Sequence, residues 1–256
     1  MELNIKNIKY DNILNDITCE FEEGKISTII TSNEEEKESL FNIITGIQKK
    51  YKGEVVNASI YKTKYQQKNP DDMLVMNTVK EELLLSLKNK NYQKETINKK
   101  IKDVLKIMKL NNNLLNRRIN SLSTGEKKLI SLATIIITNP KIIIMNDPFL
   151  YLDLENRILI KKLLKKIAKD YNKTILILTK NINEVLDIGD NYIIIQGGKV
   201  IFKGKKKELE KNIDNIKVND LQILDFIQCV RKKKNIKLDI TFDIKELMKD
   251  VYRNVR

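Results

Sequence analysis

An α/β fold with parallel strands at its core is predicted by three features of this 256-residue sequence. Two unbroken apolar runs, Lys141–Asp147 (KIIIMND) and Lys173–Lys180 (KTILILTK), have the length of strands. Between them lies the helical pattern Leu154–Tyr171, and a third apolar run, Gly24–Thr31 (GKISTIIT), precedes another helical pattern. Because strands buried on both faces read as continuous apolar runs, this alternation favours parallel strands covered by helices.

The N-terminal elements are predicted from shorter patterns. Residues 2–8 and 17–21 alternate as strands, with a turn at Tyr10–Asp16 between them. The run GKISTIIT leads into an amphipathic helix over Lys37–Ile47 that a glycine closes, and strand character returns in Gly53–Gln67.

Helices dominate the middle and the end of the chain. Residues 79–115 are helical and rich in lysine, and Glu126–Thr138 is a more apolar helix, so we expect an inserted helical subdomain at about residues 79–138. Asn191–Gly204 is predicted as a hairpin that turns at its two adjacent glycines. A main domain over residues 1–205 and a small appended segment over residues 206–256 are expected.

Composition excludes several classes of function. No apolar run approaches the roughly 18 residues that cross a bilayer, and no signal-peptide pattern is present, so a membrane role is expected to come through a partner. Cys19 and Cys229 have no metal-like spacing and histidine is absent, which argues against zinc and favours reduced thiols in cytoplasm. The formal charge of +14 comes mostly from dispersed lysine, which favours a solvated surface over a nucleic-acid site.

The stretch Thr28–Ile47 (TIITSNEEEKESLFNIITGI) has the strand–turn–helix order of a phosphate-binding loop. In the pattern G-x-x-x-x-G-K-[ST], glycines let backbone amides wrap the phosphates, Lys reaches the terminal phosphates and Ser/Thr holds Mg²⁺. Lys37 is in place, but Glu36 stands at the preceding glycine and Glu38 at the Ser/Thr position. By itself the stretch leaves open whether it was ever a nucleotide site.

A second group of motifs lies in residues 121–180 and resembles the ATP-binding subunits of ABC transporters. LSTGEKK (from Leu122) is similar to their signature motif, and IIIMNDP (from Ile142) to Walker B followed by the catalytic position. LYLD (from Leu150) is similar to the D-loop, and TILILTK (from Thr174) to the strand before the switch residue. The order and spacing agree over residues 1 to about 205. The resemblance implies an ABC-type P-loop ATPase fold with a mixed sheet core, an antiparallel β subdomain, the helical subdomain and a C-terminal helical appendage.

Two segments resemble one subfamily in particular. Lys68–Leu83 (KNPDDMLVMNTVKEEL) is similar to the Q-loop region of energy-coupling factor (ECF) transporter ATPases, which take up vitamins and transition metals. The tail Val230–Val251 resembles the C-terminal dimerisation segment of that subfamily.

The resemblance assigns roles by position. Lys180 replaces the switch histidine, Asp147 stands at the catalytic glutamate and Asn146 at the Mg²⁺-supporting aspartate. Lys68 falls on the Q-loop glutamine, with adjacent Gln67 as an alternative; Tyr10 would stack on adenine or is an ordinary strand-edge tyrosine. The implied nucleotide-binding positions are Tyr10, Asn33, Lys37, Glu38, Ser39, Lys68 and Asn146.

The departures from the family pattern weaken this site. Glu34, Glu35 and Glu36 remove the close approach that glycines allow, and they satisfy the positive helix end that a phosphate would use. A glutamate ~6 Å from a phosphate charge costs roughly 3 kcal/mol at an effective dielectric constant of about 20, and two such repulsions lower affinity by ~10⁴ if the side chains cannot turn away. We therefore expect weak or absent ATP binding and no useful hydrolysis here.

The signature segment departs less. By the resemblance, Ser123 would offer its hydroxyl and Gly125 its amide to the γ-phosphate held by a second subunit, although Thr124 replaces a glycine and Glu126 a glutamine. Ser123-x-x-Glu126 is also an ordinary capping box, so a purely structural role stays open. The D-loop residue Asp153 belongs to the same partner-facing group.

Together these features predict a degenerate ATPase subunit of an ECF-type importer, peripheral on the cytoplasmic face of the membrane. Its expected partners are an intact homologous ATPase subunit, a transmembrane coupling subunit and a substrate-binding membrane component, with ATP and Mg²⁺ mainly in the partner's site. Two alternatives remain: a self-sufficient ATPase with Glu38 on the metal, and a soluble ABC-type protein acting on nucleic acid, against which the ECF-like tail argues.

Overall fold

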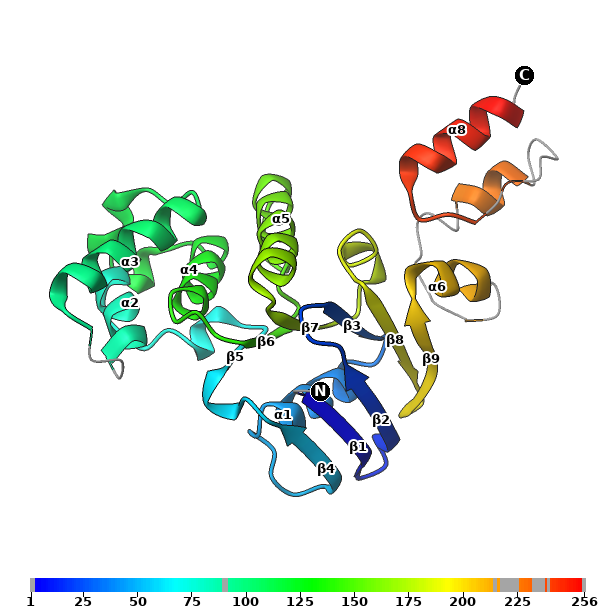
Figure 1. Cartoon of the computed structure of the whole chain (residues 1–256), viewed down its shortest axis with the longest axis horizontal. Helices are drawn as coiled ribbons and strands as arrows, with labels where there is room; N and C mark the ends of the chain where they lie inside the picture. The colour runs from blue at the N-terminus through cyan, green and yellow to red at the C-terminus, as the bar shows by residue number, and fades with distance from the viewer. Residues whose placement is uncertain are drawn as a thin grey trace. The chain divides into compact units, whose positions relative to one another are not determined.

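A computed structural model describes residues 3–88, 92–213, 216, 226–231, 238 and 240–254 (Figure 1). The chain divides into two compact units. The first comprises Met1–Leu3, Phe21–Lys25 and Val56–Ile177, and the second comprises Asn4–Glu20, Ile26–Val55 and Leu178–Arg256.

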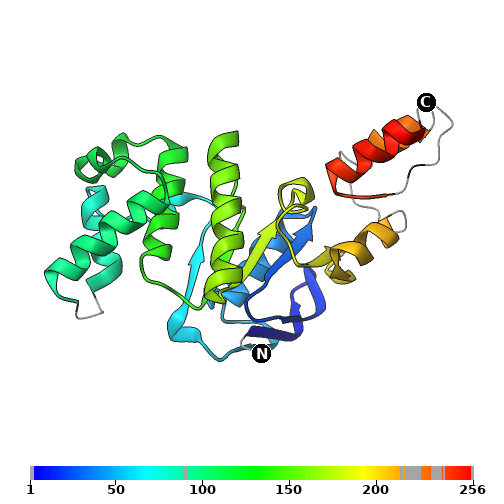
Figure 2. The same cartoon turned by 45° about the horizontal axis from the view of Figure 1, so that its top comes forward.

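The first unit contains a group of helices, one of which (α4, Thr124–Ile136) begins with the signature motif, and the strand β6 (Ile142–Asn146) that carries the Walker B motif. Its strands β5 (Thr63–Gln66) and β6 are parallel neighbours, and every residue of β6 is buried. Helices α2 (Val79–Leu87), α3 (Lys94–Ile107) and α4 pack against one another, as Figures 1 and 2 show in cyan and green. Helix α5 (Leu154–Tyr171) follows, and β7 (Thr174–Thr179), also buried throughout, leads out of this unit.

The second unit contains a mixed arrangement of strands and helix α1. Strands β3 (Ile26–Thr31) and β8 (Asn191–Gln196) pair in parallel, whereas β8 and β9 (Lys199–Lys205) pair antiparallel. A separate three-stranded sheet has the order β2-β1-β4, formed by Leu14–Phe21, Leu3–Tyr10 and Lys52–Asn57. These pairings confirm the prediction of parallel buried strands and a hairpin.

The hairpin turn confirms the role assigned to its two glycines. Gly197 and Gly198 have φ angles of 59° and 70°, which favour glycine. A Cβ on Gly198 would lie 2.5 Å from the carbonyl oxygen of Ile13, so this position admits no side chain.

Several predicted boundaries are wrong. Strand β2 begins at Leu14, inside the turn expected at Tyr10–Asp16. Helix α1 spans Glu34–Ile44 and begins three residues before the expected Lys37, because the Asn33 side chain caps it and glutamates suit the first turn of a helix. The strand expected over Gly53–Gln67 is two strands, β4 and β5, separated by a 3₁₀ turn at Ile60–Lys62.

The C-terminal segment is described in part. It contains helices α6 (Lys206–Asn212) and α8 (Ile244–Asn254), and Leu247 of α8 forms a small apolar cluster with Ile227 and Leu238. Residues 232–237 and 239 of the tail that resembles a dimerisation segment lie outside the described residues, and that role stays a prediction. Within the described ranges, no helix combines the length and the apolarity needed to span a bilayer.

The two cysteines are expected to differ sharply in reactivity. Cys19 on β2 is fully buried, and burial raises the pKa of its thiol to about 12, whereas Cys229 is exposed. Because the thiolate is the reacting form, a maleimide at pH 8 should modify one thiol per native chain, at Cys229, and two in denaturant. Peptide mass mapping measures this, and labelling of native Cys19 at a comparable rate would contradict the burial of β2.

Candidate functional site

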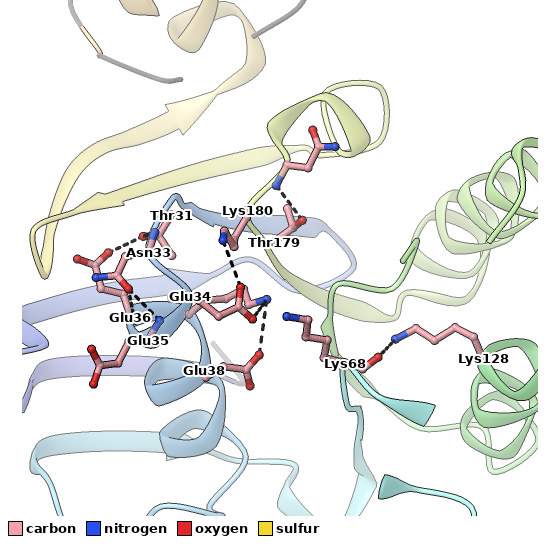
Figure 3. Close-up of polar contacts among 12 residues, drawn as sticks. Thr31, Asn33, Glu34, Glu35, Glu36, Glu38, Lys68, Lys128, Thr179 and Lys180 are labelled. Carbon is pink, nitrogen blue, oxygen red and sulfur yellow. Dashed lines mark hydrogen bonds and ion pairs between the residues drawn. The ribbon is translucent and has the colours of Figure 1, made fainter. Parts of the chain in front are cut away.

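The residue that caps α1, Asn33, binds backbone amides of the first turn of the helix with its side chain. The Asn33 side-chain oxygen accepts hydrogen bonds from the amides of Glu35 (2.8 Å) and Glu36 (3.5 Å) (Figure 3). The Asn33 amide in turn donates to the Thr31 hydroxyl at 3.2 Å. Two of the amides at the start of α1, where a phosphate-binding loop would direct them at its ligand, are therefore engaged by the Asn33 side chain.

The three glutamates of this turn have three different environments. Glu36 is 3% exposed, and its carboxylate accepts hydrogen bonds from the Thr31 hydroxyl and, at 2.8 Å, from the amide of Gly198 in the β8–β9 turn. Glu35 is exposed. The sequence predicted repulsion of a phosphate if these glutamates cannot turn away. The Glu36 carboxylate does turn away, to a donor that lies 162 residues further along the chain.

Lys37 is fully buried, and carboxylates surround its ammonium group. Its Nζ lies 3.0 Å from Glu34 Oε1 and 3.6 Å from Glu38 Oε1. The other oxygen of Glu34, Oε2, lies 3.5 Å from Lys180 Nζ, as Figure 3 shows. One carboxylate thus bridges the lysine at the phosphate position and the lysine at the switch position, a partnership that the sequence pattern did not reveal.

Two further predicted nucleotide-binding positions of the second unit are Tyr10 and Ser39. Tyr10 is the last residue of β1 and is half-buried. Ser39 is half-buried within α1. The stacking role of Tyr10 stays a prediction.

The signature segment, in the first unit, forms a complete capping box. The Ser123 hydroxyl accepts from the Glu126 amide at 3.2 Å, and Glu126 Oε2 accepts from the Ser123 amide at 2.8 Å. Arg117 adds a 2.6 Å ion pair to Glu126 Oε1, a contact that sequence reasoning missed. The hydrogen bond from the Ser123 amide, assisted by Arg117, lowers the pKa of Glu126. The alternative structural role of Ser123 is thereby confirmed, and it leaves the hydroxyl proton able to serve a second acceptor.

This capping box is expected to make stability depend on pH. Because the pKa of Glu126 is lower in the folded chain, its contribution is fully present above about pH 4.5 and is lost as the pH falls through the lower folded value. Glu126→Gln should therefore lower the melting temperature by a few degrees at pH 7 and have little effect near pH 3. Calorimetry at both pH values measures this; an equal deficit at both would contradict the assignment.

Gly125 and the D-loop segment lie against each other. A Cβ on Gly125 would lie 2.9 Å from the carbonyl oxygen of Tyr151, whose φ of 69° is in the left-handed region. Two residues later, Asp153 caps α5 by accepting from the Asn156 amide at 2.8 Å. The structure thus brings Gly125 close to the backbone of the D-loop segment.

The Walker B positions end a buried strand. Asn146 is the last residue of β6 and is 1% exposed. Asp147 follows with φ of 43° and opens a turn in which its carbonyl accepts from the Leu150 amide at 3.2 Å. The residue at the catalytic position therefore sits at the carboxyl end of the strand, where α/β proteins place ligand-binding groups.

The backbone at the Q-loop positions is hydrogen-bonded to a side chain that sequence reasoning missed. Lys128 of α4 is 1% exposed, and its Nζ donates to the carbonyl oxygens of Gln67 (3.0 Å) and Lys68 (2.9 Å). Because both carbonyls are engaged, this contact does not decide between Gln67 and Lys68. The available sequence signal was a lysine next to the apolar part of the helix, one residue before Leu129.

Comparisons with known proteins agree with the resemblance and with the predicted fold. The family model described as ABC transporter matches residues 14–150. The energy-coupling factor transporter ATP-binding protein EcfA of Methanocaldococcus jannaschii is 27% identical over an alignment of 256 positions, which covers 93% of this chain and 91% of that protein. EcfA1 of Mycoplasma mobile is 26% identical over an alignment of 266 positions, which covers 97% of this chain and 96% of that protein. An ABC transporter ATP-binding protein of Clostridium tetani is 29% identical over 226 residues, and the chain spans about half of its length (51%).

Solved structures confirm the ABC-type α/β fold. The chain superposes on cbiO1 of Clostridium perfringens, part of the ABC transporter complex cbiONQ, with a TM-score of 0.72, 24% identity and coverage of 90% and 94%. It also superposes on a dimeric ATP-binding cassette bound to ADP and Pi, with a TM-score of 0.70 and 24% identity. This superposition covers 80% of this chain and 98% of that cassette. Since the family model matches residues 14–150, which are 137 of 256 residues, the chain belongs to the ABC transporter family.

Proposed function

We propose that this chain is an ATP-binding subunit of an ECF-type membrane importer for a vitamin or a transition metal. Its own nucleotide site is degenerate, and its signature face completes the ATP site of an intact partner subunit. The similarity to EcfA and EcfA1 over more than 90% of the chain supports the subfamily.

The bridging carboxylate of Glu34 is the observation that carries the proposal for the chain's own site. It lies between Lys37, at the position of the phosphate lysine, and Lys180, at the position of the switch residue. A triphosphate at this position would have to displace the Glu34 carboxylate from both lysines. The displaced carboxylate would still lie close to the triphosphate and repel it. Together with the capped amides of α1, these residues do not fit a phosphate tail.

The signature segment, in contrast, fits a terminal phosphate. Ser123 retains a hydroxyl proton after capping α4, and the Gly125 amide lies in the first turn, where the helix dipole favours an anion. Asp153 lies in the segment after Tyr151, whose carbonyl faces Gly125. ATP and Mg²⁺ in the partner's site would supply the triphosphate and the metal, and this chain would supply positioning groups.

The membrane role follows from the same proposal. A transmembrane coupling subunit and a substrate-binding membrane component would hold the ATPase pair on the cytoplasmic face. The dimeric assembly of a superposing ATP-binding cassette supports a pair of such subunits.

ATP turnover by the purified chain, alone and mixed with an intact homologue, tests the proposal. We expect no turnover above background for the chain alone and turnover in the mixture that exceeds that of the homologue alone. Robust turnover by the chain alone would contradict it and favour the self-sufficient ATPase. Binding to duplex DNA or RNA that weakens steeply with salt would favour the nucleic-acid alternative.

A further inference from the structure

The end of β5 and the loop after it are joined to the signature helix α4 by the side chains of Lys128, Lys127 and Gln66, all within the first unit. Lys128 Nζ donates to the carbonyl oxygens of Gln67 and Lys68. Lys127 Nζ forms a 2.6 Å ion pair with Asp71. Gln66 Nε2 donates to the Ser131 hydroxyl at 2.9 Å and to the Lys128 carbonyl at 3.3 Å.

These contacts differ in burial, and therefore in strength. Lys128, Gln66 and Ser131 are each at most 1% exposed. The hydrogen bonds of Gln66 are buried, and those of Lys128 join a buried ammonium group to the carbonyls of the half-buried Gln67 and Lys68, where water competes little. The Lys127 side chain is 15% exposed and that of Asp71 is 53% exposed, which weakens their pair. An ammonium group loses much hydration energy on burial, so the carbonyls of Gln67 and Lys68 are held tightly to Lys128.

The position of Lys128 connects two functional segments. It lies five residues after Ser123, on the helix whose first turn carries the signature residues. Its acceptors are the two residues between which the Q-loop assignment is open. A shift of either segment must move the other or break two charge-assisted hydrogen bonds.

We propose that Lys128 is a positioning residue that makes the loop over residues 67–71 and the first turns of α4 move as one body. Displacement of the loop, by a partner subunit or a ligand, is then passed to Ser123 and Gly125. The joint movement of the loop and α4 concerns this chain alone. Its consequence for ATP turnover rests on the proposed function.

Amide hydrogen exchange on the purified full chain tests this joint movement. Lys128→Met keeps the length and apolar stem of the side chain but removes its donors, and we expect faster exchange, by at least about tenfold, at residues 67–71 and at 124–128 alike. Lys128→Arg, which retains donors, should restore much of the protection. Lys127→Met is the matched control on the neighbouring lysine and should change exchange near Asp71 only.

The exchange pattern distinguishes a specific link between the loop and α4 from a general loss of stability of the chain. If Lys128→Met accelerates exchange equally in β3 and β8 of the other unit, the residue serves general stability and the inference is wrong. Unchanged exchange in either the loop or the helix also overturns it.

Turnover by the mixture with an intact homologue tests the consequence. Lys128→Met should lower kcat by a factor of about 2 to 30, the range typical of substitutions that alter coupling, and leave the KM for ATP nearly unchanged. An unchanged kcat beside a faster-exchanging loop would overturn the coupling. Absence of turnover in the wild-type mixture counts against the proposed function, while hydrogen exchange still decides whether Lys128 fastens the loop.

Discussion

Ser123→Asp is expected to lower ATP turnover by the mixture of this chain and an intact homologue by about 100-fold. Aspartate caps a helix as well as serine does, so α4 should remain formed. A carboxylate about 6 Å from a phosphate charge costs roughly 3 kcal/mol at an effective dielectric constant of about 20, which corresponds to the expected factor. Steady-state kinetics of the reconstituted pair measure the effect.

Thr78→Asp supplies a matched control. Thr78 caps α2 through the same kind of capping box, with Glu81 as its partner, and therefore undergoes the same change of charge at a helix start. We expect turnover to be retained in this variant. If Ser123→Asp also retained turnover, Ser123 would be a helix cap and nothing more, and the partner-completing role would be lost.

Glu34→Gln is expected to tighten the binding of Mg–ATP to this chain alone by about 100-fold. The substitution removes one negative charge next to the expected phosphate position and frees Lys37 and Lys180 from their shared carboxylate. Loss of one repulsion of roughly 3 kcal/mol gives the expected factor. Isothermal titration with Mg–ATP, and with inorganic phosphate as a smaller probe, measures the change.

Glu35→Gln is the control for this substitution. Glu35 is the next residue of the same helical turn, carries the same charge and is exposed. Its replacement tests the general reduction of negative charge, and we expect only a small increase in affinity. Equal tightening by both variants would contradict the specific place of Glu34 between the two lysines. Micromolar Mg–ATP binding by the unaltered chain would contradict the degenerate site itself.

Local patterns predicted the core strands because a continuous apolar run within a few residues is enough to indicate a buried strand. The runs at Lys141–Asp147 and Lys173–Lys180 contain the buried strands β6 and β7, and the helix between them has the predicted bounds Leu154–Tyr171. The paired glycines after β8 predicted the hairpin because few other residues accept positive φ. The start of α1 was misplaced because three glutamates were assigned to a loop, although acidic residues suit the first turn of a helix.

The sequence by itself determined the fold class, the order of the motifs and the substitutions at the phosphate-binding loop, because these depend on residue type and spacing. Only the tertiary structure decided what each glutamate does. Glu36 turns to Gly198, and Glu34 joins Lys37 to Lys180, because folding brings together residues that are far apart in the chain. The link from Lys128 to the loop after β5 depends in the same way on the packing of α4, which no local pattern specifies.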